Sequence, residues 1–256
     1  MSTSALSTRG LDKSFGSLVV ASDIELDLPP GERYALIGPN GAGKTTLINL
    51  ITGMLKPDKG QIFLGPDEIT MLKPEERVKC GLVRTFQINT LFRSLPVLDN
   101  VALAVAERLG TSNRMWKAAS KFSEVKDETE ELLVTLGLGA DALTPVSDLP
   151  YGKQRLVEIA IALGMKPRVL LLDEPAAGVP SHESGRVIEV LDALPAEIAI
   201  LIIEHDMDLV FRFAQRITVL VQGQVLVEGT PNEIAADKRV RDVYLGEGAN
   251  ARQGNG

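Results

Sequence analysis

The chain has 256 residues, of which 45% are hydrophobic and 24% charged, with a formal net charge of −7 and a single cysteine. This balance is typical of one large globular domain, or of a core with a subdomain, and does not favour a dedicated nucleic-acid-binding surface. One cysteine excludes an internal disulfide. The N-terminus lacks the apolar core of a signal peptide, and no aliphatic stretch approaches the roughly 20 residues of a membrane-spanning helix. We therefore expect a cytoplasmic protein, unless a partner holds it at a membrane.

The β-strand signals change in kind along the chain. Residues 11–28 include an alternation of apolar and acidic residues, which predicts an antiparallel β portion at the N-terminus. Three later aliphatic stretches, at 34–37, 169–172 and 198–203, predict strands that are buried on both faces. Such strands, separated by helical segments, are typical of a parallel α/β sheet. Residues 217–227 predict a hairpin with its turn at Gln222-Gly223.

A helical pattern fills the middle of the chain, where apolar residues recur at helical spacing. We interpret residues 1–247 as one domain that ends in a flexible tail, residues 248–256. Its α/β core is expected to comprise residues 1–88 and 165–247, and its inserted α-helical subdomain residues 89–164, with boundaries accurate to a few residues.

The strongest motif follows the first buried strand. Residues 38–46 read Gly-Pro-Asn-Gly-Ala-Gly-Lys-Thr-Thr and match the phosphate-binding pattern G-x-x-x-x-G-K-[ST] before an apolar helical pattern. Glycines let successive backbone N–H groups turn toward phosphates, and the helix that follows adds its positive end. Lys44 is expected to reach the β- and γ-phosphates, and the Thr45 hydroxyl to ligate Mg²⁺. The residues expected to bind the nucleotide here are Gly38, Pro39, Asn40, Gly41, Ala42, Gly43, Lys44, Thr45 and Thr46.

A pair of carboxylates ends the second buried strand. Asp173 is positioned to bind Mg²⁺, often through water, and the Glu174 carboxylate to polarise an attacking water. Many buried strands end in acids, so the pair alone says little. Combined with the phosphate loop, it predicts nucleotide hydrolysis.

The third buried strand ends at Glu204-His205-Asp206, and His205 is one of only two histidines in the chain. A lone histidine is more often a structural residue than a catalytic one. From the residues alone, a structural role and a role at the γ-phosphate both stay open.

These motifs resemble, in order and spacing, those of ABC transporter ATPases. Phe86-Gln87 stands where that family has its glutamine loop, and residues 148–155 precede the acidic strand, where the family has its signature, usually LSGGQ. The resemblance covers nearly the whole chain. It implies a P-loop NTPase (RecA-like) parallel-sheet core and the hydrolysis of ATP with Mg²⁺.

The same resemblance implies roles for individual residues. Gln87 would sense Mg²⁺ and contact a membrane partner, Phe15 would stack on adenine, and His205 would bind the γ-phosphate. A phenylalanine in a β segment is more often part of the core, which is the alternative for Phe15. The family sandwiches each nucleotide between the phosphate loop of one subunit and the signature of another, here Tyr151 and Gly152. A chain with one set of motifs must therefore pair to work.

Finer detail is similar to the branched-chain amino-acid importer type, in the segments 84–87, 151–155 and 204–207. This implies a second ABC ATPase subunit, either a copy or a paralogue, and integral membrane permease subunits. It also implies an extracytoplasmic solute-binding protein, no nucleic-acid partner, and a peripheral location on the inner face of the cell membrane. Related importers carry urea, amides and aromatic acids, so the solute stays open.

Two residues depart from the family pattern. Pro150 replaces the signature serine and so lacks both a hydroxyl and an N–H, and Pro180 stands where the family has an aspartate. Both substitutions put the usual contacts between subunits in question. They keep open the alternative of a regulatory nucleotide-binding module without turnover, against which the intact Glu174 and His205 argue. A second alternative is a soluble ABC-class ATPase outside transport, although such proteins generally carry two ATPase units or a long coiled-coil insertion, and neither fits in 256 residues.

Overall fold

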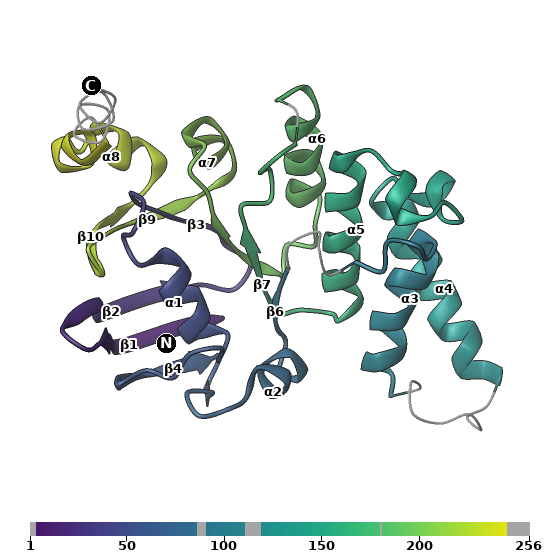
Figure 1. Ribbon diagram of the computed structural model, residues 1–256, viewed down its shortest axis with the longest axis horizontal. Helices are drawn as coiled ribbons and strands as arrows, with labels where there is room; N and C mark the ends of the chain where they lie inside the picture. The colour runs from purple at the N-terminus through teal and green to yellow at the C-terminus, as the bar shows by residue number, and fades with distance from the viewer. Residues whose placement is uncertain (1–3, 86–90, 111–118, 180, 245–256) are drawn as a thin grey trace. The chain divides into compact units, whose positions relative to one another are not determined.

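The computed structural model describes residues 4–85, 91–110, 119–179 and 181–244 (Figure 1). The chain forms two compact units, which are described separately. The first comprises Met1–Arg77 with Pro195–Gly256, and the second Val78–Leu194. The predicted division into core and helical subdomain stays a prediction.

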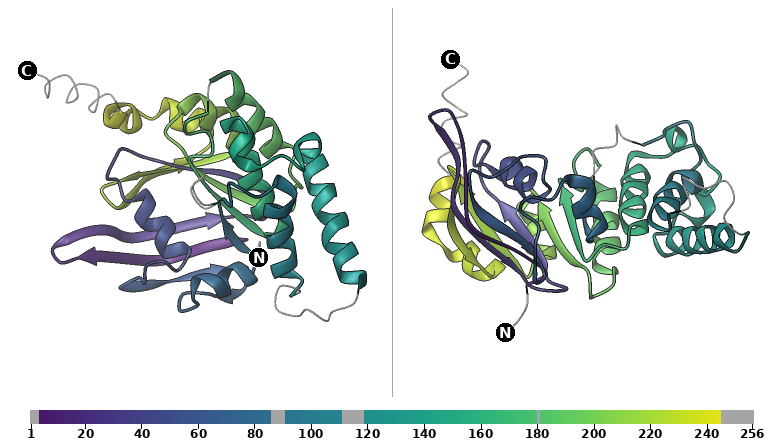
Figure 2. Two further views of the ribbon diagram at one scale, coloured as in Figure 1. Left: turned by 45° about the vertical axis from the view of Figure 1, so that its right-hand side comes forward. Right: turned by 90° about the horizontal axis from the view of Figure 1, so that it is seen from below.

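The first unit contains an antiparallel sheet near the N-terminus (Figure 2). Every pairing in it is antiparallel, as the alternation in residues 11–28 predicts. Leu6 and Leu11 of one strand and Ile24 of its neighbour are completely or almost completely buried, whereas Arg9 between the two leucines is exposed. In spatial order the strands are β2 (Leu18–Leu28), β1 (Leu6–Phe15), β4 (Lys59–Leu64) and β5 (Asp67–Glu68).

A second set of strands in the same unit surrounds β3 (Arg33–Ile37). β8 (Ala199–Ile203) and β9 (Arg216–Val221) run parallel to β3 on either side. Every residue of β3 and β8 is buried, which explains their unbroken aliphatic runs. β10 (Gln224–Gly229) returns antiparallel to β9, so the predicted hairpin is confirmed.

Four helices accompany these strands. α1 (Lys44–Ile51) buries Leu47, Ile48, Leu50 and Ile51, and α2 (Pro74–Lys79) begins in this unit. α7 (Met207–Phe213) follows β8, and α8 (Pro231–Ala236) follows β10 with a capping box of Thr230 and Glu233.

The second unit combines a parallel strand pair with a group of helices. β6 (Leu82–Arg84) lies parallel to β7 (Val169–Asp173). α3 (Val97–Arg108) contacts both α4 (Ala119–Thr135) and α5 (Tyr151–Gly164), and the three lie side by side in Figure 1. Two single-turn 3-10 helices, at Gly139–Asp141 and Val146–Asp148, connect α4 to α5, and α6 (Ser181–Asp192) follows β7.

Candidate functional site

The loop between β3 and α1 is shaped by close backbone approaches. A side chain at Gly38 would place its Cβ 2.1 Å from the carbonyl oxygen of Leu220, so only glycine fits there. Gly43 has a φ of 104°, and its Cβ would lie 2.5 Å from the carbonyl oxygen of Val20. The glycines of the motif therefore hold the loop against β2 and β9.

The loop directs its polar groups toward one place. α1 begins at Lys44 after an N-cap glycine that provides no side-chain cap, which leaves the first N–H groups of the helix without a capping side chain. The Lys44 ammonium donates to the carbonyls of Gly38 and, at 3.0 Å, of Pro39, so it lies across the loop. Asn40, Gly41 and Thr45 are exposed, Ala42 is buried, and Pro39, Gly43, Lys44 and Thr46 are partly exposed. This is the arrangement of an anion site at a helix N-terminus.

Two sets of hydrogen bonds that the sequence did not predict hold the loop and the helix that follows it. The Gly223 N–H donates to the Ala42 carbonyl at 2.8 Å, and the Ser22 N–H to the Gly223 carbonyl at 2.8 Å, so the turn of the β9–β10 hairpin holds the loop. At the other end of α1, the buried Arg77 guanidinium donates to the Leu50 and Ile51 carbonyls. The turn could be predicted from its dipeptide, whereas its contact with the loop could not.

His205 lies at the same edge of the sheet as the loop. Leu36 of β3 is in register with Ile203 of β8, and Gly38 and His205 follow these residues by two positions each. The neighbouring residues have structural roles: the Glu204 side chain is buried, and Asp206 caps α7 by accepting from two N–H groups. The His205 side chain itself is 69% exposed. A buried structural role is therefore excluded for the imidazole, and the γ-phosphate role stays a prediction.

Phe15 ends β1 and is 50% exposed, so it is not a core residue. The ammonium of Lys13 lies 5.5 Å from the centre of its ring, and Lys13 also pairs with Asp58 at 2.7 Å. An exposed aromatic face of this kind suits stacking on a base. Gln87, the other residue predicted at the nucleotide, lies outside the described residues.

The carboxylates at the end of β7 belong to the second unit. Asp173 accepts from the guanidinium of Arg84 at 2.5 Å, and both side chains are mostly buried, at 28% and 17% exposure. Glu174 is exposed and has a positive φ of 48°, which a residue with a side chain adopts only at a cost. The Arg84–Asp173 pair escaped the sequence analysis, because 89 residues separate its members.

The signature segment starts α5. Pro150 is its N-cap and makes no side-chain capping bond, Tyr151 is 39% exposed and Gly152 is buried. Beside the helix start lies a cavity of about 450 Å³ whose lining residues all belong to the second unit. They are Gly137, Pro150, Gly152, Lys153, Leu156, Arg186 and Val187. Pro180, the second departure from the family pattern, lies outside the described residues.

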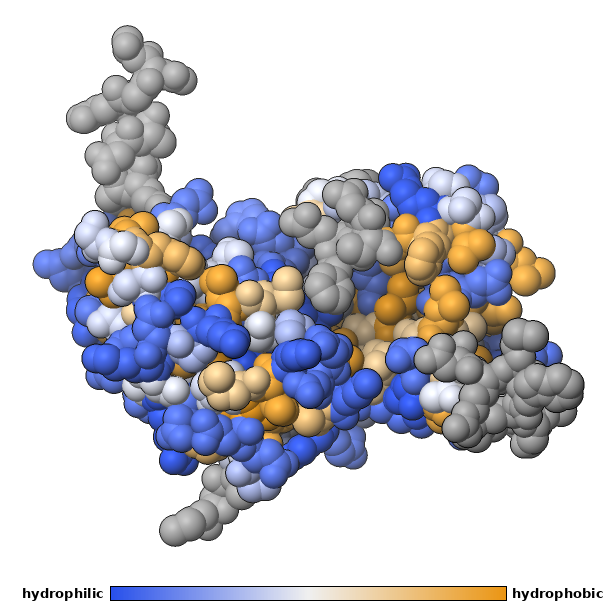
Figure 3. Space-filling view, turned by 60° about the horizontal axis from the view of Figure 1, so that its bottom comes forward, coloured by the Kyte–Doolittle hydropathy of each residue, from blue (hydrophilic) through white to orange (hydrophobic). Residues whose placement is uncertain are grey.

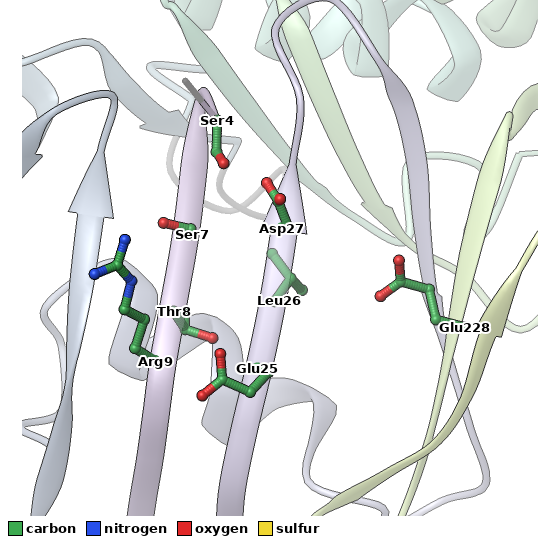
Figure 4. A pocket seen from close by; sticks show the side chains of 8 residues that line it. All are labelled: Ser4, Ser7, Thr8, Arg9, Glu25, Leu26, Asp27 and Glu228. Atoms are coloured by element: carbon green, nitrogen blue, oxygen red, sulfur yellow. The ribbon is translucent and has the colours of Figure 1, made fainter. Parts of the chain in front are cut away.

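A smaller cavity of about 220 Å³ lies at the start of β1, at the opposite end of that strand from Phe15. Figure 4 shows Glu228 of β10 across it from Asp27 and Leu26 of β2. Its other lining residues are Ser4, Ser7, Thr8, Arg9 and Glu25. None of the residues predicted to bind the nucleotide lines this cavity.

The chain matches two protein-family models. Residues 21–177 match the model described as ABC transporter, which is more than half of the chain. The chain belongs to the ABC transporter family. Residues 224–250 also match a model described as branched-chain amino acid ATP-binding cassette transporter. The predicted family is therefore confirmed.

Curated relatives extend the match over nearly the whole chain. The high-affinity branched-chain amino acid transport ATP-binding protein LivG of Escherichia coli is 40% identical over 96% of this chain and its own full length. BraF of Pseudomonas aeruginosa, also a high-affinity branched-chain amino acid transport ATP-binding protein, is 35% identical over 96% of this chain and 100% of its own length. The lipopolysaccharide export system ATP-binding protein LptB of Acidithiobacillus ferridurans is 39% identical over 94% of this chain and 97% of its own length.

Solved structures confirm the P-loop NTPase fold. The ADP conformation of MJ1267, an ATP-binding cassette of an ABC transporter, matches with a TM-score of 0.83 and 31% identity over 95% of this chain and 99% of that one. CbiO1 of Clostridium perfringens, part of the ABC transporter complex cbiONQ, matches with a TM-score of 0.80 and 28% identity, covering 95% of both chains. The chain is thus an ATP-binding subunit of the ABC class of ATPases. These comparisons support the transport interpretation, not the two alternatives.

None of the helices in the described ranges combines the length and apolar character needed to cross a membrane.

Proposed function

We propose that the chain is the ATP-hydrolysing motor of an importer for branched-chain amino acids or a related small polar solute. The observation that carries the proposal is the similarity to LivG over the full length of both proteins. The branched-chain family match at residues 224–250 supports it independently, because that segment lies outside the general ABC match.

In this proposal the phosphate loop holds the triphosphate by its N–H groups and Lys44, and Phe15 stacks on adenine. The uncapped start of α1 and the half-exposed Phe15 ring support both roles. The Lys44 ammonium, now bonded to two loop carbonyls, would turn to the phosphates. Its charge would then offset the charge that develops in the transition state.

Magnesium would be held by the hydroxyl of Thr45, the carboxylate of Asp173 and the amide of Gln87. Mg²⁺ in such sites needs only one or two protein carboxylates besides the phosphates of the substrate. Asp173 would supply such a carboxylate, which in this structure accepts from the guanidinium of Arg84. The ion would neutralise charge on the β- and γ-phosphates.

Hydrolysis would be assigned to Glu174 and His205. The Glu174 carboxylate would orient and polarise the attacking water, and the exposed His205 imidazole would contact the γ-phosphate. These groups act by positioning and electrostatics, in keeping with the chemistry of phosphoryl transfer.

The signature of this chain would complete the nucleotide site of a second ATPase subunit. Tyr151 and Gly152 would then offer their N–H groups, at the start of α5, to the γ-phosphate of that subunit's ATP. Support comes from the open cavity beside Pro150 and Gly152 and from the absence of a capping side chain there.

Permease subunits would dock on the second unit, which holds the chain at the inner face of the cell membrane. Hydrophobic side chains gather on one face of the region of α3 to α5 in Figure 3. Phe92, Leu95 and Leu103 are large exposed apolar residues of this unit, at 59%, 36% and 49% exposure. A short helix from the permease is the kind of partner that such a surface accepts.

The catalytic part is tested with Glu174→Gln in the purified protein. Turnover should fall by about 10² or more while ATP binding persists, because a general base contributes about that much. The matched control is Glu189→Gln, which changes an exposed glutamate on α6 of the same unit. Rapid turnover in Glu174→Gln would move the catalytic role to another group, with His205 the first candidate.

The transport part is tested by uptake of radiolabelled leucine in cells that lack the native chain. Wild-type chain should restore uptake and Lys44→Ala should not. Restored ATPase activity without uptake of leucine, urea, amides or aromatic acids would remove the importer assignment and leave the ATPase assignment intact.

A further inference from the structure

A buried arginine joins the signature helix to the turn that follows β7. Arg155 on α5 is 9% exposed at its side chain, and its partner Glu158 is 5% exposed. Arg155 donates to Glu158 at 2.8 Å and to the backbone carbonyl of Ala177 at 3.4 Å. Its guanidinium also lies 5.5 Å from the centre of the Tyr151 ring. One side chain thus contacts a signature residue and the segment after the catalytic strand.

Tyr151 also lies against the segment after β7. A Cβ at Gly178, where φ is +74°, would lie 3.1 Å from two ring carbons and from the hydroxyl oxygen of Tyr151, so this side chain fits closely against the glycine. The Ala177 N–H in turn donates to the Glu174 carbonyl at 3.0 Å, which closes a turn between them. Glu174, Ala177 and Gly178 therefore share one turn, held by Arg155 and Tyr151.

The arrangement is costly, which argues for a purpose beyond packing. Among the ion pairs of the described ranges, none has both partners as buried as Arg155 and Glu158. Within those ranges, the Arg155 Nε and one Glu158 oxygen are buried without a hydrogen-bond partner. Burial raises the pKa of Glu158 although its bond to Arg155 lowers it. A well-packed apolar pair would fill the same space at less cost. An apolar pair would lack the planar guanidinium of Arg155, which can bind the Ala177 carbonyl and lie over the Tyr151 ring at the same time.

We propose that Arg155 is a positioning residue that holds Tyr151 and the Glu174 turn as one rigid block. The inference rests on the proposed function, in which Glu174 acts on this chain's own ATP and Tyr151 faces the ATP of a second subunit. Arg155 then couples the two nucleotide sites. A displacement of Tyr151 by the second nucleotide is transmitted to the turn that carries Glu174.

The main test replaces the pair with apolar residues of similar length, Arg155→Met/Glu158→Met, so that no charge is left unpaired. The full-length protein should fold and bind a fluorescent ATP analogue as the wild type does. Its kcat should fall by about 10- to 100-fold with KM unchanged, because small misplacements of catalytic groups cost that much. Hydrogen exchange of the amides at 174–178 should also become faster.

The chain offers a matched control in the same unit. Arg108 likewise bridges a glutamate, Glu128, and a backbone carbonyl, that of Gly164 at 2.8 Å. Arg108→Met/Glu128→Met should leave kcat and the exchange at 174–178 unchanged. Equal losses of kcat in both double variants would overturn the proposal, because they would report general loosening of the unit.

Arg155→Lys keeps the test decisive if the double variant does not fold. Lysine keeps a charge for Glu158 but cannot also hold the Ala177 carbonyl and cover the Tyr151 ring. We expect near-normal thermal stability with kcat at least about tenfold lower. Wild-type kcat in Arg155→Lys refutes the proposal. If Glu174→Gln also kept wild-type turnover, the proposed catalytic function itself would fail. Loss in Glu174→Gln with no loss in either Arg155 variant rejects the coupling alone.

Discussion

The phosphate loop and the signature segment are built by different means, although the family places both against a nucleotide. The loop is held mainly by backbone groups, because Gly38 lies against the Leu220 carbonyl and the Ala42 carbonyl accepts from the Gly223 N–H, and the Lys44 ammonium adds bonds to loop carbonyls. The signature segment is held by side chains, which are the Tyr151 ring and the buried Arg155.

This difference has a consequence for how each segment tolerates change. The phosphate loop depends on a few glycines and on Lys44, so a single substitution at one of them should remove ATP binding. The start of α5 has Pro150 where the family has a serine, and it presents the N–H groups of Tyr151 and Gly152. Substitutions there should therefore be able to strengthen or weaken the binding of a second subunit's ATP. Substitutions in each segment therefore test the contrast, starting with the largest expected effect.

Lys44→Ala should have the largest effect. It removes the one ammonium group of the loop, and a hydrogen bond to a charged group is worth about 1.5–3 kcal/mol. ATP affinity should fall by at least about 10- to 100-fold, and turnover should be nearly abolished. Titration with a fluorescent ATP analogue and a steady-state ATPase assay measure the two quantities.

Lys56→Ala is the control, because Lys56 is an exposed lysine between α1 and β4 in the same unit. It should behave as the wild type. Wild-type turnover in Lys44→Ala would contradict the assignment of the loop and remove the basis of the contrast.

Gly152→Asp should separate the two segments. It adds bulk and negative charge at the start of α5, where a second subunit's phosphate is proposed to bind, and leaves the phosphate loop intact. The monomer should therefore still bind ATP, while ATP-driven pairing in the Glu174→Gln background is lost, as gel filtration would show. Normal ATPase activity in Gly152→Asp, with any co-purifying partner ATPase present, would mean that this signature completes no active site.

Pro150→Ser should strengthen pairing. It restores a hydroxyl and an N–H, and at about 1.5–3 kcal/mol for a bond to a charged group the gain is about ten- to a hundredfold in the Glu174→Gln background. Pro150→Ala is the matched control, since it restores the N–H alone. A serine that only caps α5 would raise thermal stability by about 1 kcal/mol without any effect on pairing, which would contradict this prediction.

The features that the sequence predicted are those set by residues close together in the chain. The strands buried on both faces, the hairpin at 217–227 and the phosphate loop depend on residues close together in the chain, and all were predicted. The strand-end position of His205 followed from the same logic.

The long-range contacts were not predicted, because no local pattern encodes them. Arg84 meets Asp173 across 89 residues, and Arg155 meets Ala177 across 22. An arginine reads in sequence as a solvated residue, and only the fold shows that these two bind acidic or carbonyl groups in partly or fully buried places. The exposure of Phe15 also required the structure, because a phenylalanine in a strand is usually buried.

Glu32 is a mostly buried carboxyl group in the same unit as the phosphate loop, and it tests whether side-chain charge affects that loop. It lies directly before β3, where its N–H donates to the Pro29 carbonyl and its carbonyl accepts from the Ile200 N–H. Its side chain is 15% exposed and lies 3.9 Å from Arg216. Within the described ranges, one of its carboxylate oxygens is buried without a hydrogen-bond partner. Burial raises the pKa of Glu32, in spite of Arg216 and with the help of the nearby Glu228.

Glu32→Gln should give the smallest effect, a rise in stability. Because the folded-state pKa is raised, the carboxyl group favours folding most when it is protonated, below its ordinary pKa, and this contribution is lost as the pH rises through the folded-state pKa. Glu32→Gln should therefore raise the midpoint of thermal unfolding at pH 7.5, and the difference from the wild type should shrink toward zero near pH 4. We expect a gain of about 1 kcal/mol or less, or about 2–4 °C at most. Glu197→Gln, an exposed change in the same unit, should show no such trend. ATP affinity should stay at the wild-type value, because the backbone frames the loop; a tenfold change in affinity would show that side-chain charge shapes it too.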